Sequence, residues 1–136
     1  MILQVGVKAL LKNKEGKYLL LERSLKKYPE IKGRWDIVGG RINPGDTLID
    51  SLKREIKEET NLDLEKTPRL IAAQDIIVGD EKHVVRLTYM VEIDGEPTLD
   101  TEENENFKWL TLDEIKAIED LDIYFKQLIR EGKFDE

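Results

Sequence analysis

The sequence contains no cysteine and a single histidine, His83. Without cysteine, the chain can form no disulfide bond, no thiolate metal site and no cysteine nucleophile. His83 opens a predicted strand beside a charged turn, which is more typical of an exposed edge residue than of a catalytic base. No apolar run approaches the roughly 18 residues that a membrane-spanning helix needs. The first residues also lack the basic start and cleavage site of a secretory signal, so we expect a cytoplasmic protein.

The chain is also poor in positive charge for its length. Its 136 residues carry 22 Lys and Arg against 29 Asp and Glu, a net charge of −7. This balance argues against nucleic acid or an anionic membrane surface as a partner. Hydrophobic residues make up 40% of the chain, which is enough for one core, and no linker or repeat divides it. We therefore predict a single domain over residues 1–136.

The apolar periodicities predict an α/β (α+β) protein. Strands are predicted over 5–11, 18–22, 35–38, 70–78, 84–93 and 107–110, and helices over 48–60, directly after Thr111, and over 118–131. Residues 94–105 are predicted to form an acidic loop that contains no basic residue. Helices that stand apart from pairs of strands are typical of a sandwich built on a mixed sheet.

The helix predicted over 48–60 has clear signals at both ends. Thr47, with Asp50 three residues later, fits an N-terminal capping box. Asn61 suits the left-handed position that follows a helix. One face of this helix is apolar at helical spacing, through Leu48, Ile49, Leu52 and Ile56, and we expect it to pack on the core.

The opposite face of the same helix carries three carboxylates. Glu55, Glu58 and Glu59 are spaced i, i+3 and i+4, so they project from one side over about one turn. A Glu-rich helix face is most often only a solvated surface. Here, however, like charges are stacked four residues apart, which costs stability. Clustered carboxylates suit a hard divalent cation such as Mg²⁺, which binds oxygen ligands.

The spacing of these residues matches a known family motif. The pattern Gly40-x5-Asp46-x7-Arg54-Glu55-Ile56-x-Glu58-Glu59-x-Asn61-Leu62 resembles the MutT-like Nudix box, Gly-x5-Glu-x7-Arg-Glu-U-x-Glu-Glu-x-Gly-U, in which U is a bulky aliphatic residue. Asp46 replaces Glu and Asn61 replaces Gly, and we expect both to keep structural roles. Residues 35–40 resemble the family's Trp-x-x-Pro-Gly-Gly segment, with Val38 in place of Pro, and residues 109–114 resemble its late Trp segment.

This resemblance implies a fold, a cofactor and a reaction. The fold would be the Nudix α/β/α sandwich with a mixed central sheet. The reaction would be the Mg²⁺-dependent hydrolysis of a nucleoside diphosphate linked to another moiety, with Mn²⁺ as an alternative metal. By position, Glu58, Glu59 and the Gly39 carbonyl would bind metal, Glu55 would bind metal or act as base, and Arg54 would orient the glutamates.

The remaining site predictions are less specific. Relatives place the general base differently, and we favour Glu103 in the acidic loop over its neighbours Glu102 and Glu105, although a solvated loop is the simpler interpretation. Arg23 and Arg34, with Lys32, are candidates for binding substrate phosphates, and Gly40 for close backbone approach to a ligand. Trp35 and Phe107 are candidates for stacking on a nucleobase, although core packing explains an aromatic residue equally well.

Several alternatives remain open at this point. A non-catalytic Nudix-like module that binds or senses a nucleotide is the main alternative function, and a carboxylate-rich cation-binding protein is a third. No Pro or Tyr lies near Ile77 and Val78, where family markers for ADP-ribose, dinucleoside polyphosphates or NADH usually occur. This leaves nucleoside triphosphates and nucleotide sugars as substrates. A homodimer is also left open.

Overall fold

Strand β1 (Ile2–Lys12) is the centre of the fold in the computed structural model, which describes residues 1–134. The other strands are β2 (Tyr18–Arg23), β3 (Trp35–Asp36), β4 (Val38–Arg41), β5 (Arg69–Val78), β6 (Lys82–Glu92) and β7 (Asn104–Leu110). The helices are α1 (Leu48–Thr60), α2 (Leu112–Lys116) and α3 (Ile123–Arg130). Among the described residues, none of the helices is long and apolar enough to cross a membrane.

The seven strands form one sheet of mixed direction. Strand β1 runs parallel to β6 over its whole length, from Ile2 opposite Lys82 to Lys12 opposite Glu92, and β5 is antiparallel to β6. On its other side, β1 pairs with β4 along residues 6–9 and meets β2 at Lys12. Strand β2 continues the sheet through β3 and β7. The predicted mixed sheet is therefore confirmed.

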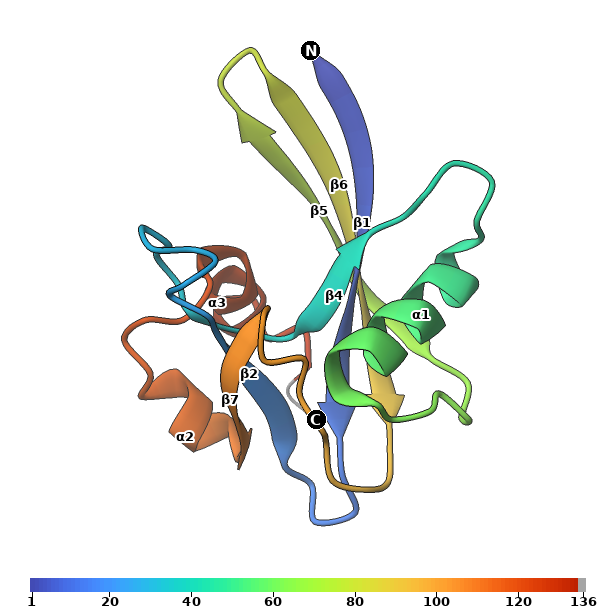
Figure 1. Ribbon diagram of the computed structural model, residues 1–136, viewed down its shortest axis with the longest axis vertical. Coiled ribbons are helices and arrows are strands. Elements are labelled where there is room, and N and C mark those ends of the chain that lie inside the picture. Colours follow the sequence, from blue (N-terminus) through green and yellow to red (C-terminus); the bar gives the residue numbers. More distant parts are fainter. Residues whose placement is uncertain (135–136) are drawn as a thin grey trace.

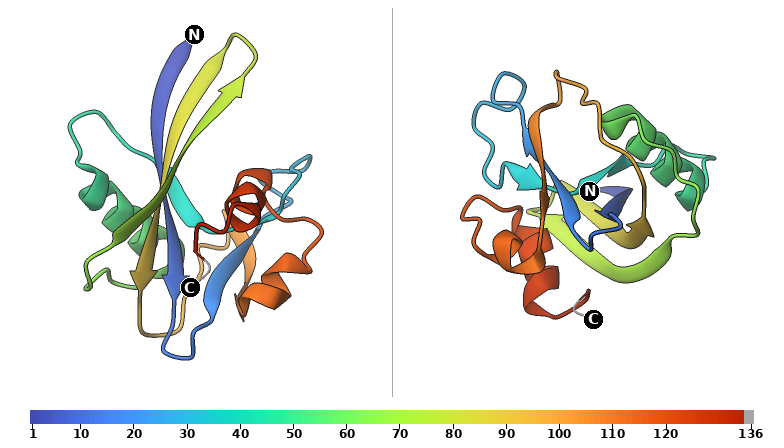
Figure 2. Two further views of the ribbon diagram at one scale, coloured as in Figure 1. Left: turned by 180° about the vertical axis from the view of Figure 1, so that it is seen from behind. Right: turned by 90° about the horizontal axis from the view of Figure 1, so that it is seen from below.

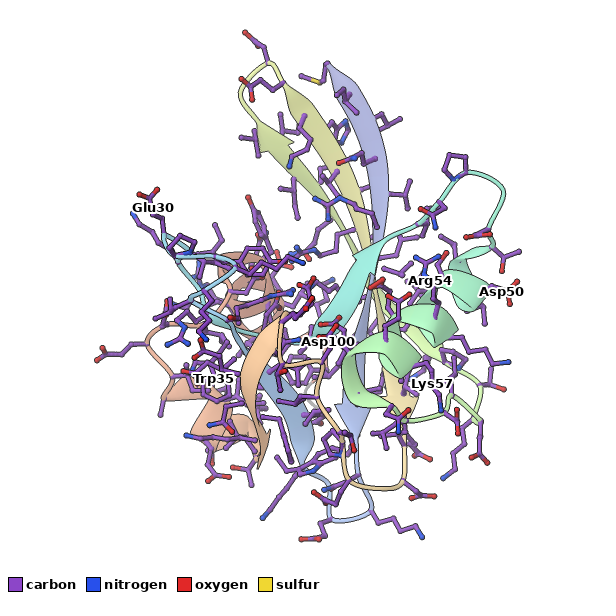
Figure 3. The ribbon with its side chains drawn as sticks, in the orientation of Figure 1. Glu30, Trp35, Asp50, Arg54, Lys57 and Asp100 are labelled. Atoms are coloured by element: carbon purple, nitrogen blue, oxygen red, sulfur yellow. The ribbon has the colours of Figure 1, made fainter. Side chains whose placement is uncertain are left out.

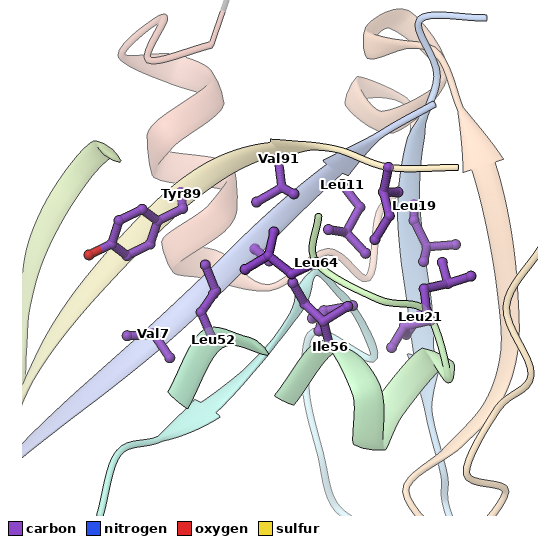
Figure 4. Packing of buried hydrophobic residues seen from close by; sticks show 13 residues of the cluster. Val7, Leu11, Leu19, Leu21, Leu52, Ile56, Leu64, Tyr89 and Val91 are labelled. Carbon is purple, nitrogen blue, oxygen red and sulfur yellow. The ribbon is translucent and has the colours of Figure 1, made fainter. Parts of the chain in front are cut away.

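The helices cover opposite faces of this sheet, with α1 on one side and α2 and α3 on the other (Figures 1 and 2). Successive residues of β1 alternate between two hydrophobic clusters, which makes three layers. Leu11 packs with the α1 residues Leu52 and Ile56, as Figure 4 shows, whereas Leu10 packs with Phe125 of α3. Leu52 and Ile56 are fully buried, and each such side chain contributes roughly 1.5–3 kcal/mol to stability.

Helix α1 has the boundaries that its sequence predicts. The Thr47 hydroxyl accepts a hydrogen bond from the backbone N–H of Asp50, and Asn61 ends the helix in the left-handed conformation with φ of 60°. The apolar face is shorter than expected, because Ile49 remains 40% exposed. Ile49 lies in the first turn, next to the exposed segment 43–47, where no strand covers it.

Several predicted boundaries were wrong, and those near the site matter most. Strand β4 includes Gly39 and Gly40, and β7 begins at Asn104, so the acidic loop is shorter than predicted. The last helix begins at residue 123 and not at 118. Residues 118–122 are instead held by Trp35, whose N–H donates to the Asp120 carbonyl and whose carbonyl accepts from the Asp122 N–H.

Candidate active site

A cleft of about 530 Å³ opens between α1, strand β4 and the segments that follow β2 and precede β7. Its lining is strongly polar and carries both signs of charge. The acidic side chains are Asp36, Glu55, Glu58, Glu59, Asp100, Glu103 and Asp122, and the basic ones are Lys8, Arg23, Lys32, Arg41 and Arg86. Figure 3 shows Arg54 on α1 and Asp100 in the segment before β7, with this region between them. The predicted glutamates therefore face a surface that also offers positive charge.

Two glycines of β4 bring the sheet and α1 into close contact. A Cβ atom on Gly39 would lie 2.2 Å from the Val7 carbonyl oxygen of β1. A Cβ atom on Gly40 would lie 2.4 Å from Oε1 of Glu55. Both distances are far below van der Waals contact, so neither position accommodates a side chain in this arrangement. The pair is thus not a turn, but the place where the Glu55 carboxylate rests on the β4 backbone.

Glu59 is the most deeply buried of the three glutamates predicted as metal ligands, with 5% exposure. A buried carboxylate is costly unless hydrogen bonds and charges compensate it. Oε1 accepts the backbone N–H of Gly39 at 2.8 Å, and Oε2 accepts the side-chain amide of Asn104 at 3.0 Å. Arg23 Nη1 lies 3.9 Å from Oε2. Glu59 therefore joins α1 to β2, β4 and β7.

Arg54 lies among the other acidic residues of the motif. Its Nε is 3.6 Å from Glu58 Oε1, and its Nη2 is 3.7 Å from Glu55 Oε2. Nη1 donates to Asp46 Oδ2 at 3.2 Å, and Nη2 donates to the Arg41 carbonyl at 3.0 Å. This arrangement ties the helix to the β4–α1 loop and holds two carboxylates near one guanidinium. The orienting role of Arg54 stays a prediction, with which these contacts are compatible.

The donor chemistry of the cleft fits a hard divalent cation. Burial, followed by the negative charges of Glu59 and Glu58, raises the pKa of Glu55, so its ionised form is disfavoured in the cleft as it stands. Within residues 1–134, no three acidic or histidine side chains already stand close enough to enclose an ion. Mg²⁺ does not need such a cage, because it keeps several waters and binds one or two protein carboxylates.

A buried ion pair that the sequence reasoning missed forms part of the cleft lining. Lys8 Nζ lies 2.8 Å from Asp36 Oδ2 and also donates to the Ile37 carbonyl. Burial alone would raise the pKa of Asp36, but the charges of Lys8, Arg86 and Arg23 outweigh it and lower that pKa. The available signal was a lysine inside the apolar run 5–11, since an unpaired ammonium is not stable in a core.

The comparisons with known proteins agree with this geometry. The family model described as NUDIX domain matches residues 2–131. The chain belongs to the NUDIX family. Two solved structures are similar to this chain over nearly its whole length. A MutT protein from Methanosarcina mazei Go1 has a TM-score of 0.77 at 27% identity and covers 96% of each chain. A MutT NUDIX hydrolase from Burkholderia pseudomallei has a TM-score of 0.80 at 26% identity, over 96% of this chain and 98% of its own.

Curated relatives of this NUDIX chain are named as nucleotide hydrolases. An oxidized purine nucleoside triphosphate hydrolase of Mus musculus is 29% identical over 108 residues, which are 75% of this chain and 67% of the relative. An 8-oxo-dGDP phosphatase of Homo sapiens is 34% identical over 59 residues, which are 43% of this chain. This chain spans only 17% of that relative's length. Both relatives are thus named for hydrolysis of oxidised purine nucleotides.

The predicted base Glu103 reaches the NUDIX cleft but is already engaged there. Its Oε1 accepts a hydrogen bond from Lys27, and its Oε2 accepts one from the Tyr28 hydroxyl at 2.6 Å. Burial would raise the pKa of Glu103, but these two hydrogen bonds outweigh it and lower that pKa. A carboxylate held in this way accepts a further proton less readily, and it anchors the loop that follows β2.

The predicted substrate residues are divided between the cleft and the rest of the surface. Arg23, Lys32 and Gly40 line it. Arg34 does not, because it contacts Glu22, Glu105 and the Arg23 carbonyl. Trp35 and Phe107 do not line it either, and each packs partly buried against a hydrophobic cluster. Lys108 Nζ lies 5.1 Å from the centre of the Trp35 ring. Trp35 is on the side of the molecule away from Arg54 (Figure 3).

Proposed function

We propose that this chain is a Mg²⁺-dependent pyrophosphohydrolase that cleaves a nucleoside diphosphate linked to another moiety. The observation that carries this proposal is that Glu55, Glu58 and Glu59 line one polar cleft together with Gly39, whose backbone N–H contacts Glu59. Arg23 and Lys32 line the same cleft and would attract the anionic substrate that the net charge of −7 repels. The site also lies within the residues that match the NUDIX family model.

In this proposal, Glu58, Glu59 and the Gly39 carbonyl would hold the cation, with Glu55 as a further ligand or the base. A bound divalent cation would polarise the phosphoryl oxygens and lower the pKa of a coordinated water. Arg54 would keep Glu55 and Glu58 in orientation through its contacts of 3.6–3.7 Å. Such positioning matters because phosphoryl transfer depends mainly on alignment and electrostatic stabilisation.

The general base has two candidates in this proposal. Glu103 is the candidate from the acidic loop, and Glu55 is the one from the helix. The hydrogen bonds from Lys27 and Tyr28 lower the pKa of Glu103, whereas burial and neighbouring charges raise the pKa of Glu55. A base works best when its pKa lies near the working pH, so these directions favour Glu55. Glu103→Gln should then retain more activity than Glu55→Gln.

For the substrate, we propose a nucleoside triphosphate, with nucleotide sugars as the second class. Because two curated relatives are named for oxidised purine nucleotides, these nucleotides are the first substrates to test. The test is a panel of ordinary and oxidised purine nucleoside di- and triphosphates, pyrimidine nucleotides and nucleotide sugars, assayed with Mg²⁺, with Mn²⁺ and with EDTA. The expected result is metal-dependent release of phosphate or pyrophosphate from a subset of the panel.

Three variants complete this test. Glu58→Gln and Glu59→Gln should each abolish most of the turnover, whereas Glu119→Gln, an exposed acid outside the cleft, should leave it unchanged. Full activity in both cleft variants would overturn the metal assignment. Tight nucleotide binding by the wild type without any turnover would instead indicate the sensor module.

A further inference from the structure

The pairing of β2 with β7 contains an irregularity beside the cleft. Leu21 is opposite Phe107 and Glu22 is opposite Asn106, but Arg23 is then opposite Asn104. Residue 105 is therefore the extra residue of a β-bulge, and bulges re-aim side chains. Leu21 and Phe107 both pack in the cluster beneath α1, which identifies the face of this strand pair that looks toward α1.

The bulge decides which residue of β7 reaches Glu59. In a regular strand, positions 109, 107, 105 and 103 would share one face, so Glu105 and Glu103 would follow Phe107 toward α1. The shift instead places Asn104 opposite Arg23, and residues that lie opposite each other share a face. Glu105 pairs with Arg34 and Glu103 pairs with Lys27, and neither of these basic residues belongs to α1. A neutral amide thus takes the place of an acid.

Asn104 is fully buried, and its contact with Glu59 is specific. Its Nδ2 donates to Glu59 Oε2 at 3.0 Å, while its Oδ1 has no partner among the described residues. Rotating the amide by half a turn would set Oδ1 against the carboxylate, so only one orientation is compatible with Glu59. The amide is oriented to donate to Glu59 even though its own acceptor is left unsatisfied.

Arg23 adds an attraction to the same carboxylate oxygen. Arg23 Nη1 lies 3.9 Å from the same Oε2, too far for a hydrogen bond but close enough to draw the carboxylate toward β2. With Oε1 fixed by the Gly39 N–H and Oε2 by Asn104, the carboxylate keeps one plane and one rotamer. Each oxygen retains a further lone pair that can face the cleft.

We infer that Asn104 is a positioning residue for Glu59, and that it presets this carboxylate for a divalent cation. The inference rests on the metal site of the proposed function and adds to it a residue outside the box motif. Outer partners that orient metal ligands typically change metal affinity or activity by about 10- to 100-fold when they are removed.

The test measures Mn²⁺ affinity by electron paramagnetic resonance, with the full chain and without nucleotide. Asn104→Leu keeps the size of the side chain but removes the donor, and Asn104→Ala is the second variant in case the first does not fold. Asn106→Leu on the same strand is the matched control, because Asn106 is exposed and does not line the cleft. Near-ultraviolet circular dichroism checks that each variant keeps the native fold.

The expected result is a dissociation constant for Mn²⁺ raised by about 10- to 100-fold in Asn104→Leu and unchanged in the control. In the Glu59→Gln background the same substitution should change the constant less than about twofold, since its partner carboxylate is already gone. Equal losses in both backgrounds, or no loss in either, would overturn the inference. A wild type that binds Mn²⁺ but hydrolyses no nucleotide would overturn the proposed function alone.

Discussion

Replacing Lys8 with Met is the most direct test of how the floor of the cleft is stabilised. The two side chains have similar shapes, so the substitution removes the ammonium and leaves little cavity. The partner Asp36 keeps its carboxylate in a site where its side chain is 8% exposed. Its remaining partners are the N–H of Ile37, which donates to Oδ1 at 2.7 Å, and two arginines: Arg23, whose Nη2 lies 3.8 Å from Oδ2, and Arg86, which acts through its charge.

The size of the effect follows from what remains around Asp36. Removing one member of a buried ion pair usually costs about 3–5 kcal/mol, because the other charge is left buried without compensation. Arg86 and Arg23 supply part of that compensation, so we expect a loss of about 3 kcal/mol in the free energy of unfolding. For a chain of this length, 1 kcal/mol corresponds to roughly 3–4 °C, so Tm should fall by about 10 °C.

Thermal and urea unfolding followed by circular dichroism would measure this loss. Asp36→Asn in the same background should recover part of the stability, because no charge then remains unpaired. Lys14→Met is the control, since the Lys14–Asp94 pair is 3.7 Å apart and largely exposed, and it should change Tm by no more than about 2 °C. A Lys8→Met protein as stable as the wild type would refute this account of the pair.

Three further predictions concern the helix and its contact with β4. Burial and the two neighbouring glutamates raise the pKa of Glu55 above the ordinary 4.5. At pH values above the raised pKa, the ionised Glu55 therefore lowers the stability of the fold. At pH values below 4.5 Glu55 is protonated in both the folded and the unfolded chain, so this cost disappears. Glu55→Gln should therefore raise Tm in EDTA near about pH 8 and lose this gain toward about pH 4; an equal gain at both pH values would contradict the assignment. Gly39→Ala should lower the free energy of unfolding by about 1–3 kcal/mol or more, and with it Tm, because its Cβ meets a backbone oxygen. Gly40→Ala meets only the Glu55 carboxylate and should weaken Mn²⁺ binding with a smaller loss of Tm. Similar thermal losses in both glycine variants would show that the carboxylate cannot move aside. Thr47→Ala removes the N-cap of α1 and should lower the free energy of unfolding in urea by about 1 kcal/mol. An unchanged free energy of unfolding would contradict this role of Thr47.

Local signals explain why α1 could be predicted residue by residue. Thr47 and Asn61 act on backbone groups within four residues of themselves, so the sequence around them contains all that determines the helix ends. The predicted helix over 118–131 failed for the opposite reason. Its first residues bond to the Trp35 backbone, which lies more than eighty residues earlier in the chain. Such pairing depends on the tertiary fold and leaves no periodic pattern.

The three glutamates show the same limit within the site. Helical spacing placed them on one side of α1, but it could not distinguish the exposed Glu58 from the buried Glu59. That difference comes from Gly39 and Asn104, which lie 20 and 45 residues away in sequence. Asn104 was missed for a related reason, because the alternation of β7 is interrupted by a bulge that no residue type announces.

The parallel pairing of β1 with β6 also has a consequence for synthesis. Every ladder partner of β1 in this pairing lies roughly eighty residues later in the chain, from Ile2 with Lys82 onward. β1 therefore leaves the ribosome well before its longest partner exists, and its apolar centre has only the nearer strands β2 and β4 to pair with. Contacts of such long range slow folding and prolong the exposure of unpaired edges. The β1–β6 ladder should therefore be completed only after about residue 92 has emerged.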